Sequence, residues 1–373
     1  MKVIIAGDYC PQDRVSGLIQ SGNFEAIFGE VKQVLNGVDY SIVNLECPLA
    51  NDKTLPIKKK GPCLKCSREG VDAIEWAGFK CVTLANNHFR DYGNEGVKAT
   101  IDYLDERSID HVGGGRNITQ ASAVFYKDIK GKRLAIINCC EHEFSIATDE
   151  MGGSNPLNPI QQYYSIQEAR KEADYILVVV HGGHEHFQLP SPRMQDTYRF
   201  FVDVGADAVI NHHQHCYSGY EVYKGKPIFY GLGNFCFDNG KYRRNNWNYG
   251  YMVTLDFEET GINYSMHPYI QCDDEPGIKL LPDGTFTKKL SELNSIIQRK
   301  VSLSEAVKSY YDKTGILLGD ILEPIRNRYY LSSKHRGWMP SLISKERIIA
   351  ATNFICCESH RDKLINWLLN NNH

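Results

Sequence analysis

The chain has 373 residues, of which 42% are hydrophobic and 23% are charged, so it can bury the core of a large domain with an appendage or of two medium domains. The formal net charge of −3 gives no reason to expect general affinity for nucleic acid or for an anionic membrane. No apolar run approaches the roughly 18 residues of a membrane-spanning helix, and no apolar leader follows Met1 and Lys2. We therefore expect a cytoplasmic protein without a membrane span.

Residues 1 to about 270 alternate strand-like runs with helical segments, which is typical of a layered α/β domain. The strand-like runs are rich in Val and Ile and too short for helices, and they cover residues 3–8, 41–46, 82–88, 134–139, 176–181, 208–215, 228–232 and 251–257. Helical periodicity covers residues 68–77, 93–107 and 192–204. The polar segments 54–66 and 151–159 are expected to be loops.

The apolar pattern changes after about residue 282. Residues 290–311, 317–330 and 345–369 carry apolar side chains at three- and four-residue spacing, which predicts helices, and strand signals stop. We expect an α/β domain over residues 1–282 and a helical appendage over residues 283–373. The appendage would pack on the main domain or join two copies of the chain into a homo-oligomer.

The 12 cysteines do not indicate a disulfide framework, because such frameworks belong to short secreted chains. Cys81, Cys139, Cys140 and Cys236 lie in apolar runs, and Cys356 and Cys357 lie on predicted helices. In such places cysteine behaves as a small buried hydrophobic residue. The pair Cys63 and Cys66 has the Cys-x-x-Cys spacing, but no second pair completes a zinc ribbon. We expect reduced thiols.

Five of the strand-like runs end abruptly in an acid, an amide or a histidine. These terminal residues are Asp8, Glu46, Asn87 with His88, His181, and His213 with His215. In an open α/β sheet, ligands bind where the strands end at their carboxyl edge, so the five ends describe one polar pocket. Carboxylate, amide and imidazole donors together are typical of a divalent-metal site.

Each of these residues alone has an ordinary explanation. Asp8 suits a turn, and Asn87 with His88 suits a polar loop. His213 and His215 are a stronger signal, because alternate residues of an extended segment point the same way and can face one ion. Five strand ends acquiring ligand chemistry together favour a metal site.

The same residues resemble those of the CapA family of bacterial capsule and poly-γ-glutamate synthesis proteins, a branch of the calcineurin-like metallophosphoesterases. The resemblance spans roughly residues 3–270 and rests on six ordered blocks, which are Gly7-Asp8, Asn44-Leu45-Glu46, residues 84–88 with Asp91-Tyr92-Gly93, His181, residues 212–215 and residues 230–238. It implies a four-layer αββα sandwich with a two-metal centre at the strand ends. It does not cover the helical tail.

The resemblance also implies roles for single residues. Asp8 and His215 look like ligands of one metal ion, Asn87, His181 and His213 look like ligands of the other, and Glu46 looks like the bridging carboxylate. His88 looks like the group that contacts the substrate phosphate or protonates the leaving group, with Asp91 holding its imidazole. Asn234 borders the expected pocket. Arg14, like Lys60, Arg243 and Arg244, could bind the anionic part of a substrate or belong to the charged surface.

Three positions depart from the wider phosphoesterase pattern. Cys10 stands where a histidine is usual, Glu46 stands for an aspartate, and Gln214 stands for a proline. Cys10 could ligate as a thiolate, which would favour zinc or iron, or it could be a small neutral residue that leaves the first ion with fewer protein ligands. The expected cofactors are two divalent ions, with manganese, zinc and iron all open.

These observations predict a metal-dependent phosphoesterase, for monoesters or diesters. Its substrate would be a small phosphorylated metabolite or sugar phosphate of capsule or cell-surface polysaccharide biosynthesis, a context that comes from the resemblance. One alternative is a non-catalytic component of a capsule or poly-γ-glutamate synthesis assembly. Another is a metal-dependent γ-glutamyl or amide hydrolase, because two-metal centres also serve aminopeptidases.

Overall fold

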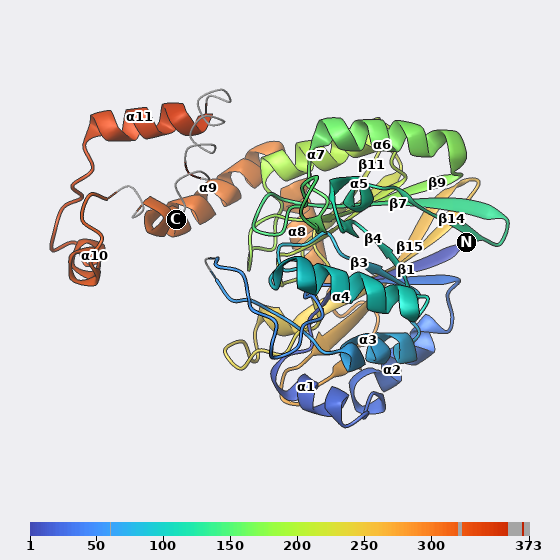
Figure 1. The fold of residues 1–373 in the computed structure, drawn as a ribbon. Coiled ribbons are helices and arrows are strands. Elements are labelled where there is room, and N and C mark those ends of the chain that lie inside the picture. The colour runs from blue at the N-terminus through green and yellow to red at the C-terminus, as the bar shows by residue number, and fades with distance from the viewer. Residues whose placement is uncertain (60, 320–322, 357–367, 369–373) are drawn as a thin grey trace. The chain divides into compact units, whose positions relative to one another are not determined.

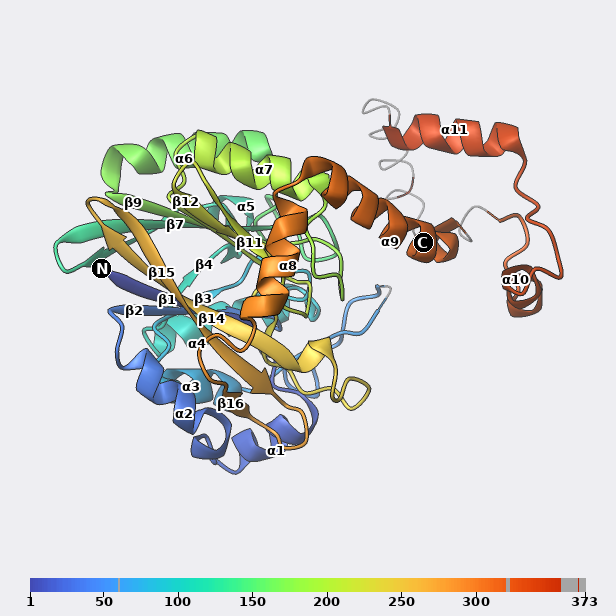
Figure 2. The same cartoon turned by 180° about the vertical axis from the view of Figure 1, so that it is seen from behind.

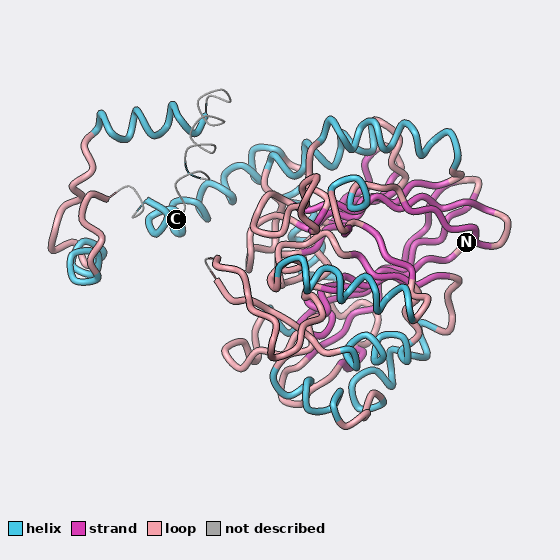
Figure 3. The backbone as a smooth tube through the Cα atoms, in the orientation of Figure 1, coloured by secondary structure: helices cyan, strands magenta, loops and turns pink. Residues whose placement is uncertain are grey.

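The computed structural model describes residues 1–59, 61–319, 323–356 and 368. The chain divides into two compact units, Met1–Ser304 and Glu305–His373. The first unit contains two large sheets with helices on their outer faces, as Figures 1 and 3 show. The central parallel strands of both sheets are mostly apolar and buried, as expected where both faces of a parallel sheet are covered.

The first sheet is built around four parallel strands. In spatial order its strands are β16 (Ile278–Leu280), β15 (Gly261–Gln271), β14 (Tyr249–Glu258), β1 (Lys2–Tyr9), β2 (Tyr40–Leu45), β3 (Cys81–Thr83) and β4 (Asp110–Val112), and β13 (Asn234–Cys236) pairs with the end of β1. Strands β1 to β4 run parallel, whereas β14 to β16 are antiparallel to their neighbours. All six residues of β2 are buried.

The second sheet follows the same plan. Its spatial order is β11 (Tyr220–Tyr223), β12 (Lys226–Phe229), β10 (Ala208–His212), β9 (Tyr175–His181), β7 (Lys132–Cys140) and β6 (Phe125–Ile129). The four inner strands are parallel, and the two edge strands are antiparallel to them. A short antiparallel ribbon pairs β5 (Gly114–Gly115) with β8 (Gly153–Ser154), and β8 lies inside the segment 151–159, which was expected to be a loop.

Helices cover the outer face of each sheet. The first sheet is covered by α1 (Asp13–Gln20), α2 (Glu25–Leu35), α3 (Arg68–Ala77) and α4 (Gly93–Glu106), and the second by α6 (Pro159–Glu172) and α7 (Pro192–Asp203). The short α5 (Ile118–Ala121) lies beside the β5–β8 ribbon. The order helix, sheet, sheet, helix is the predicted αββα sandwich, which is confirmed.

Helix α8 (Thr287–Ile297) belongs to the first unit, although it follows residue 282, where we expected the domain boundary. It packs on β11, where the Asn294 side chain accepts a hydrogen bond from the backbone N–H of Tyr220 at 2.7 Å (Figure 2). The Gln195 side chain of α7 donates to the carbonyl of Ile297 at 2.8 Å. An appendage over residues 283–373 stays a prediction.

Helices and irregular segments alternate in the rest of the described tail. Residues 323–327 and 336–344 are not helical, so the expected helix over 317–330 is wrong at residues 323–327. Helix α9 (Lys300–Gly319) is separated from α8 by two residues, so the expected helix over 290–311 is two helices. Helices α10 (Arg328–His335) and α11 (Lys345–Cys356) follow, and most of the remainder of the third expected helix lies outside the described residues. Among the described residues, no helix is both long and apolar enough to cross a bilayer.

Candidate metal centre

The predicted strand ends converge between the two sheets. Asp8 is the penultimate residue of β1 and Glu46 directly follows β2 in the first sheet, while His181 closes β9 in the second. The strand register places Asp8 opposite Asn44. His181 Nε2 lies 3.5 Å from Glu46 Oε1, so side chains of the two sheets meet here.

Two groups of possible ligands share one carboxylate. Glu46, His181 and His213 form the first, and Asp8, Glu46 and His215 form the second, with the ligand atoms of each group within 4.8 Å of one another. Asn87 lies beside the first group, since its Oδ1 is 3.0 Å from His181 Nε2. All six side chains predicted as ligands therefore lie in one buried place.

The electrostatics of the site fit divalent ions. Both oxygens of Glu46 are buried, and neither has a hydrogen-bond partner among the described residues. Burial, followed by the charge of Asp8, raises the pKa of Glu46 well above its usual range. Burial raises the pKa of Asp8 to about 7, against the hydrogen bonds that Asn44 and the backbone of His213 donate to it. Two buried carboxylates this close call for positive charge between them.

The histidines have the protonation state that ligands need. Burial lowers the pKa of His181 and of His215 well below the usual histidine value, with the neighbouring His213 as the next cause. Both imidazoles are therefore neutral at pH 7 and can offer a lone pair. The donor set of carboxylates, neutral imidazoles and one amide oxygen fits zinc, manganese or iron.

His213 and His215 converge for a different reason from the one expected. Strand β10 ends at His212, and both residues have positive φ, 90° for His213 and 55° for His215. Residues with a side chain rarely adopt this left-handed region, and it recurs at functional sites. The turn also points the His213 N–H at Asp8 Oδ2, at 3.1 Å.

A second cluster surrounds His88. His88 Nδ1 lies 2.6 Å from Asp91 Oδ2, and Asp91 is fully buried. The ammonium group of Lys59 pairs with Asp91 Oδ1 and lies 3.2 Å from His88 Nδ1. The backbone N–H of Leu64 donates to Asp91 Oδ2 at 2.7 Å. These contacts fix the imidazole ring of His88.

The two residues predicted to meet substrate have partners inside the chain. Asn234 Oδ1 lies 2.9 Å from His215 Nδ1, so Asn234 orients a possible ligand. The Arg14 guanidinium pairs with Asp238 at 2.9 Å and donates to the carbonyl oxygens of residues 272, 273 and 274. Arg243 also pairs with Asp238. Lys60 lies outside the described residues.

Several residues of the site were not singled out from the sequence. Asn44 Nδ2 donates to Asp8 Oδ1 at 2.7 Å, and its place before Glu46 was the available signal. Glu143 Oε2 accepts from Asn87 Nδ2 at 3.4 Å, and the side chain is 39% exposed. His212 Nδ1 lies 3.5 Å from Asp8 Oδ1, and neither ring nitrogen has a hydrogen-bond partner among the described residues. Lys59 lies in the segment expected to be an exposed loop.

Cys10 belongs to neither ligand group found among the described residues. Its sulfur accepts a hydrogen bond from Gln12 Nε2 at 3.4 Å, and burial raises the pKa of the thiol. A neutral thiol agrees with the second interpretation of Cys10, in which it is a small neutral residue and not a metal ligand. The ten cysteines whose side chains are described are all free thiols.

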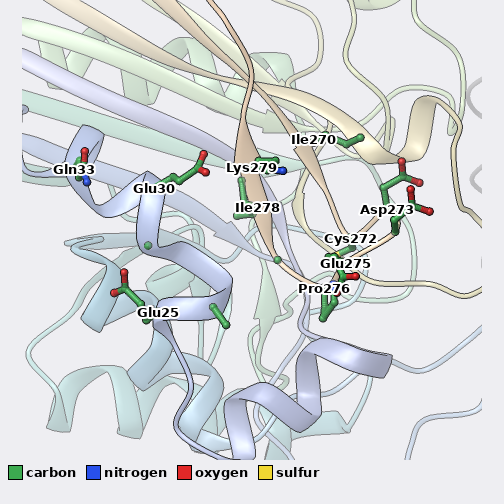
Figure 4. A pocket seen from close by; sticks show the side chains of 14 residues that line it. Glu25, Glu30, Gln33, Ile270, Cys272, Asp273, Glu275, Pro276, Ile278 and Lys279 are labelled. Atoms are coloured by element: carbon green, nitrogen blue, oxygen red, sulfur yellow. The ribbon is translucent and has the colours of Figure 1, made fainter.

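A cavity of about 570 Å³ lies elsewhere, between α2 and the segment 270–279 (Figure 4). Carboxylates line it, among them Glu25, Glu30 and Glu275. It contains none of the residues predicted for the site. The candidate metal site therefore rests on its ligand chemistry and not on cavity size.

The comparisons with known proteins identify the family of the chain. Residues 2–239 match the family model described as bacterial capsule synthesis protein PGA_cap. The capsule biosynthesis protein CapA of Bacillus anthracis is 34% identical over 248 residues, which is 64% of this chain and 60% of that protein. The PGA biosynthesis protein CapA of Bacillus subtilis is 31% identical over 237 residues, 63% of this chain and 62% of that protein. The chain thus spans about three fifths of the length of these relatives.

Solved structures give weaker matches. A hypothetical protein from Thermus thermophilus is 16% identical with a TM-score of 0.46, covering 76% of this chain and 100% of that chain. A 5'-nucleotidase from Candida albicans is 10% identical with a TM-score of 0.41, covering 84% of this chain and 57% of that chain.

Proposed function

The chain belongs to the family of bacterial capsule synthesis proteins, and we propose that it is a metal-dependent phosphoesterase within that biosynthesis. Its substrate would be a phosphorylated metabolite or sugar phosphate, and the free thiols support a cytoplasmic location. The observation that carries the proposal is Glu46. Its two oxygens are buried without a hydrogen-bond partner among the described residues, and it belongs to both ligand groups.

The proposed ligand sets follow the two groups. Asp8 and His215 would hold one divalent ion, and Asn87, His181 and His213 would hold the other, with Glu46 shared. When bound, manganese, zinc or iron ions would supply Lewis-acid polarisation of a phosphoryl oxygen and activation of water. Asn44 and Asn234 orient Asp8 and His215 by hydrogen bonds of 2.7 and 2.9 Å.

His88 is the proposed proton donor to the leaving oxygen. The 2.6 Å contact of its Nδ1 with Asp91 fixes the ring and leaves Nε2 for the substrate. Lys59 balances the buried charge of Asp91. A positioned imidazole of this kind contributes about 10²- to 10⁴-fold to a reaction rate.

The experiment measures hydrolysis of an aryl phosphate monoester and diester by the full chain, first stripped with a chelator and then loaded with manganese, zinc or iron. We expect turnover only with metal, and we expect His88→Ala to lower kcat about 100-fold at unchanged metal content. His111→Ala is the matched control, because His111 lies on β4 and pairs with Asp105. Full metal loading without turnover, or equal rates for the His88 variant and the wild type, would rule the proposal out.

A second candidate function rests on the relatives, since the protein from Bacillus subtilis is described as a PGA biosynthesis protein. A two-metal centre can also hydrolyse amides, so γ-glutamyl peptides should be assayed beside the phosphate esters. Cleavage of peptides alone would favour the amide hydrolase. Metal binding without cleavage of either class would favour a non-catalytic component of the synthesis assembly.

A further inference from the structure

One segment of the second unit has a charge opposite to that of the whole chain. Residues 325–349 contain six lysines and arginines and a single acid, Glu346, whereas the whole chain has a net charge of −3. We call these residues the basic segment. The net charge of the whole chain gave no reason to expect affinity for an anionic membrane. The basic segment is positively charged, so that argument does not apply to it.

The basic segment is folded around a buried carboxylate. Glu323 is 2% exposed and accepts hydrogen bonds from the Tyr330 hydroxyl at 3.0 Å and from the Ser341 hydroxyl at 2.7 Å. The backbone N–H of Leu342 also donates to it, at 3.1 Å, and Lys334 pairs with it at 2.9 Å. These bonds connect α10 to the residues that follow it, and they pair one of the six basic side chains, Lys334, with an acid.

The other five basic side chains are exposed. They are Arg326, Arg328, Arg336, Lys345 and Arg347, and none forms an ion pair with an acid in the described part of the chain. Two of them lie over neighbouring aromatic rings, Arg328 at 5.0 Å from the Tyr329 ring and Arg336 at 5.0 Å from the Trp338 ring. Positive charge and aromatic rings are thus presented together.

Large apolar side chains are exposed among these charges. Tyr329 is 72% exposed, Trp338 is 70% exposed and Ile349 is 70% exposed, and Met339, Leu342 and Ile348 are each at least 44% exposed. Exposed apolar groups rimmed by charge mark an interaction site. Trp and Tyr beside Lys and Arg are the residues that anchor proteins at the boundary between lipid headgroups and acyl chains.

We infer that the basic segment docks on an anionic phospholipid membrane surface. A soluble polyanion would use the five charges and leave the apolar side chains in water, whereas a membrane surface receives both. A second copy of the chain offers an acidic main unit, but it would likewise use mainly the charges. The inference concerns attachment to the surface and does not depend on the proposed phosphoesterase.

The experiment is co-sedimentation of the full chain with unilamellar vesicles of phosphatidylcholine, with and without phosphatidylglycerol. We expect binding to the anionic vesicles only, weakening as salt is added. Replacing the five exposed basic residues by Gln should lower the bound fraction at least tenfold. Tyr329→Ala with Trp338→Ala should lower it about tenfold at unchanged charge.

A control variant carries five Gln substitutions at exposed lysines of the first unit, namely Lys53, Lys58, Lys241, Lys279 and Lys288. It should bind anionic vesicles like the wild type. All substituted side chains are exposed, and circular dichroism checks that each variant is folded. Equal losses in the control and test variants would overturn the inference, as would no binding to anionic vesicles or equal binding to neutral ones. Competition by soluble polyglutamate with no need for Trp338, or a charge-dependent dimer seen by light scattering without vesicle binding, would also overturn it.

Discussion

At the scale of single residues, Glu46 determines how the centre responds to substitution, because it belongs to both ligand groups. Glu46→Gln keeps the shape and removes the charge. We expect elemental analysis to find almost no bound metal in this variant. In the presence of a chelator, its free energy of unfolding should be at least that of the wild type and up to about 1 kcal/mol higher. The reason is that an amide costs less to bury than a carboxylate.

Glu143→Gln is the control for this substitution, since Glu143 is partly exposed and adjoins only the first group. It should keep most of the metal. Retention of two ions per chain by the Glu46 variant would show that the shared carboxylate does not hold the ions together.

His212 gives a pH dependence whose sign can be worked out. Burial lowers the pKa of His212 from 6.5 to about 3. Between these values the unfolded chain binds a proton that the folded chain does not, so folding loses stability as the pH falls below about 6.5. For one such histidine, the free energy of unfolding falls by up to about 1.4 kcal/mol per pH unit.

The measurement is urea unfolding of the wild type and His212→Asn between pH 7.5 and 4.5, in chelator. The wild type should lose more stability than the variant across this range. Asp8 and the other buried histidines titrate in both proteins, so the difference between the two proteins isolates His212. Parallel curves would contradict the prediction.

Lys59 tests the cluster behind His88. Lys59 and Asp91 are 3% and 0% exposed, so Lys59→Met leaves the buried Asp91 carboxylate without its ammonium partner. Loss of a buried partner costs about 3 kcal/mol or more, and the loosened imidazole of His88 should lower kcat more than KM changes. Lys65→Met is the control, because its partner Asp52 is fully exposed and such pairs contribute about 1 kcal/mol or less. Similar unfolding energies for the two variants would exclude a structural role for the Lys59 pair.

At the scale of elements, the position of Asp8 depends on a close approach of two backbones. Asp8 N–H donates to the Gly233 carbonyl at 3.2 Å, and a Cβ on Gly7 would overlap that carbonyl oxygen. We expect Gly7→Ala to lower the free energy of unfolding by about 3 kcal/mol and to weaken metal binding, since backbone must move. Gly17→Ala in α1 meets nothing within 4 Å and should be neutral or stabilising by up to about 1 kcal/mol. Equal stability of the two variants, measured by urea unfolding, would contradict this.

The elements also show how far the sequence could predict the site. Asp8, Glu46 and His181 could be predicted because each follows a buried apolar run, and parallel strands bring such ends to one edge. The convergence of His213 and His215 was expected from strand alternation, but it comes from two positive φ angles. A positive φ is uncommon outside glycine, and its enrichment in histidine is too weak to predict it at a particular position.

The burial of charged loop residues also could not be predicted from the sequence. Three consecutive lysines, residues 58–60, indicate a solvated loop, yet the Lys59 side chain is buried against Asp91. The pairing is tertiary and joins residues 32 apart. Arg14 illustrates the reverse case, since a guanidinium that suits phosphate is used by Asp238 and three backbone carbonyls.

At the scale of the whole molecule, the two units differ in charge. Residues 305–373 contain ten lysines and arginines and seven acids, a net charge of +3, so residues 1–304 carry −6. The proposed ligands all lie in the acidic unit and the basic segment lies in the other. The proposed metal chemistry thus belongs to one unit and the inferred surface attachment to the other.

A chain ending at Ser304 separates the two assignments. Both sheets, the helices that cover them and α8 lie within residues 1–304, and the hydrogen bonds of α8 to Tyr220 and Gln195 are retained. We therefore expect the shortened protein to unfold cooperatively and to bind as much metal as the full chain, measured by calorimetry and elemental analysis. It should no longer sediment with anionic vesicles, because it lacks every charge of the basic segment and has a net charge of −6. Vesicle binding by the shortened chain would place the attachment in the first unit, and loss of metal would mean that residues 305–373 are needed to keep the centre intact.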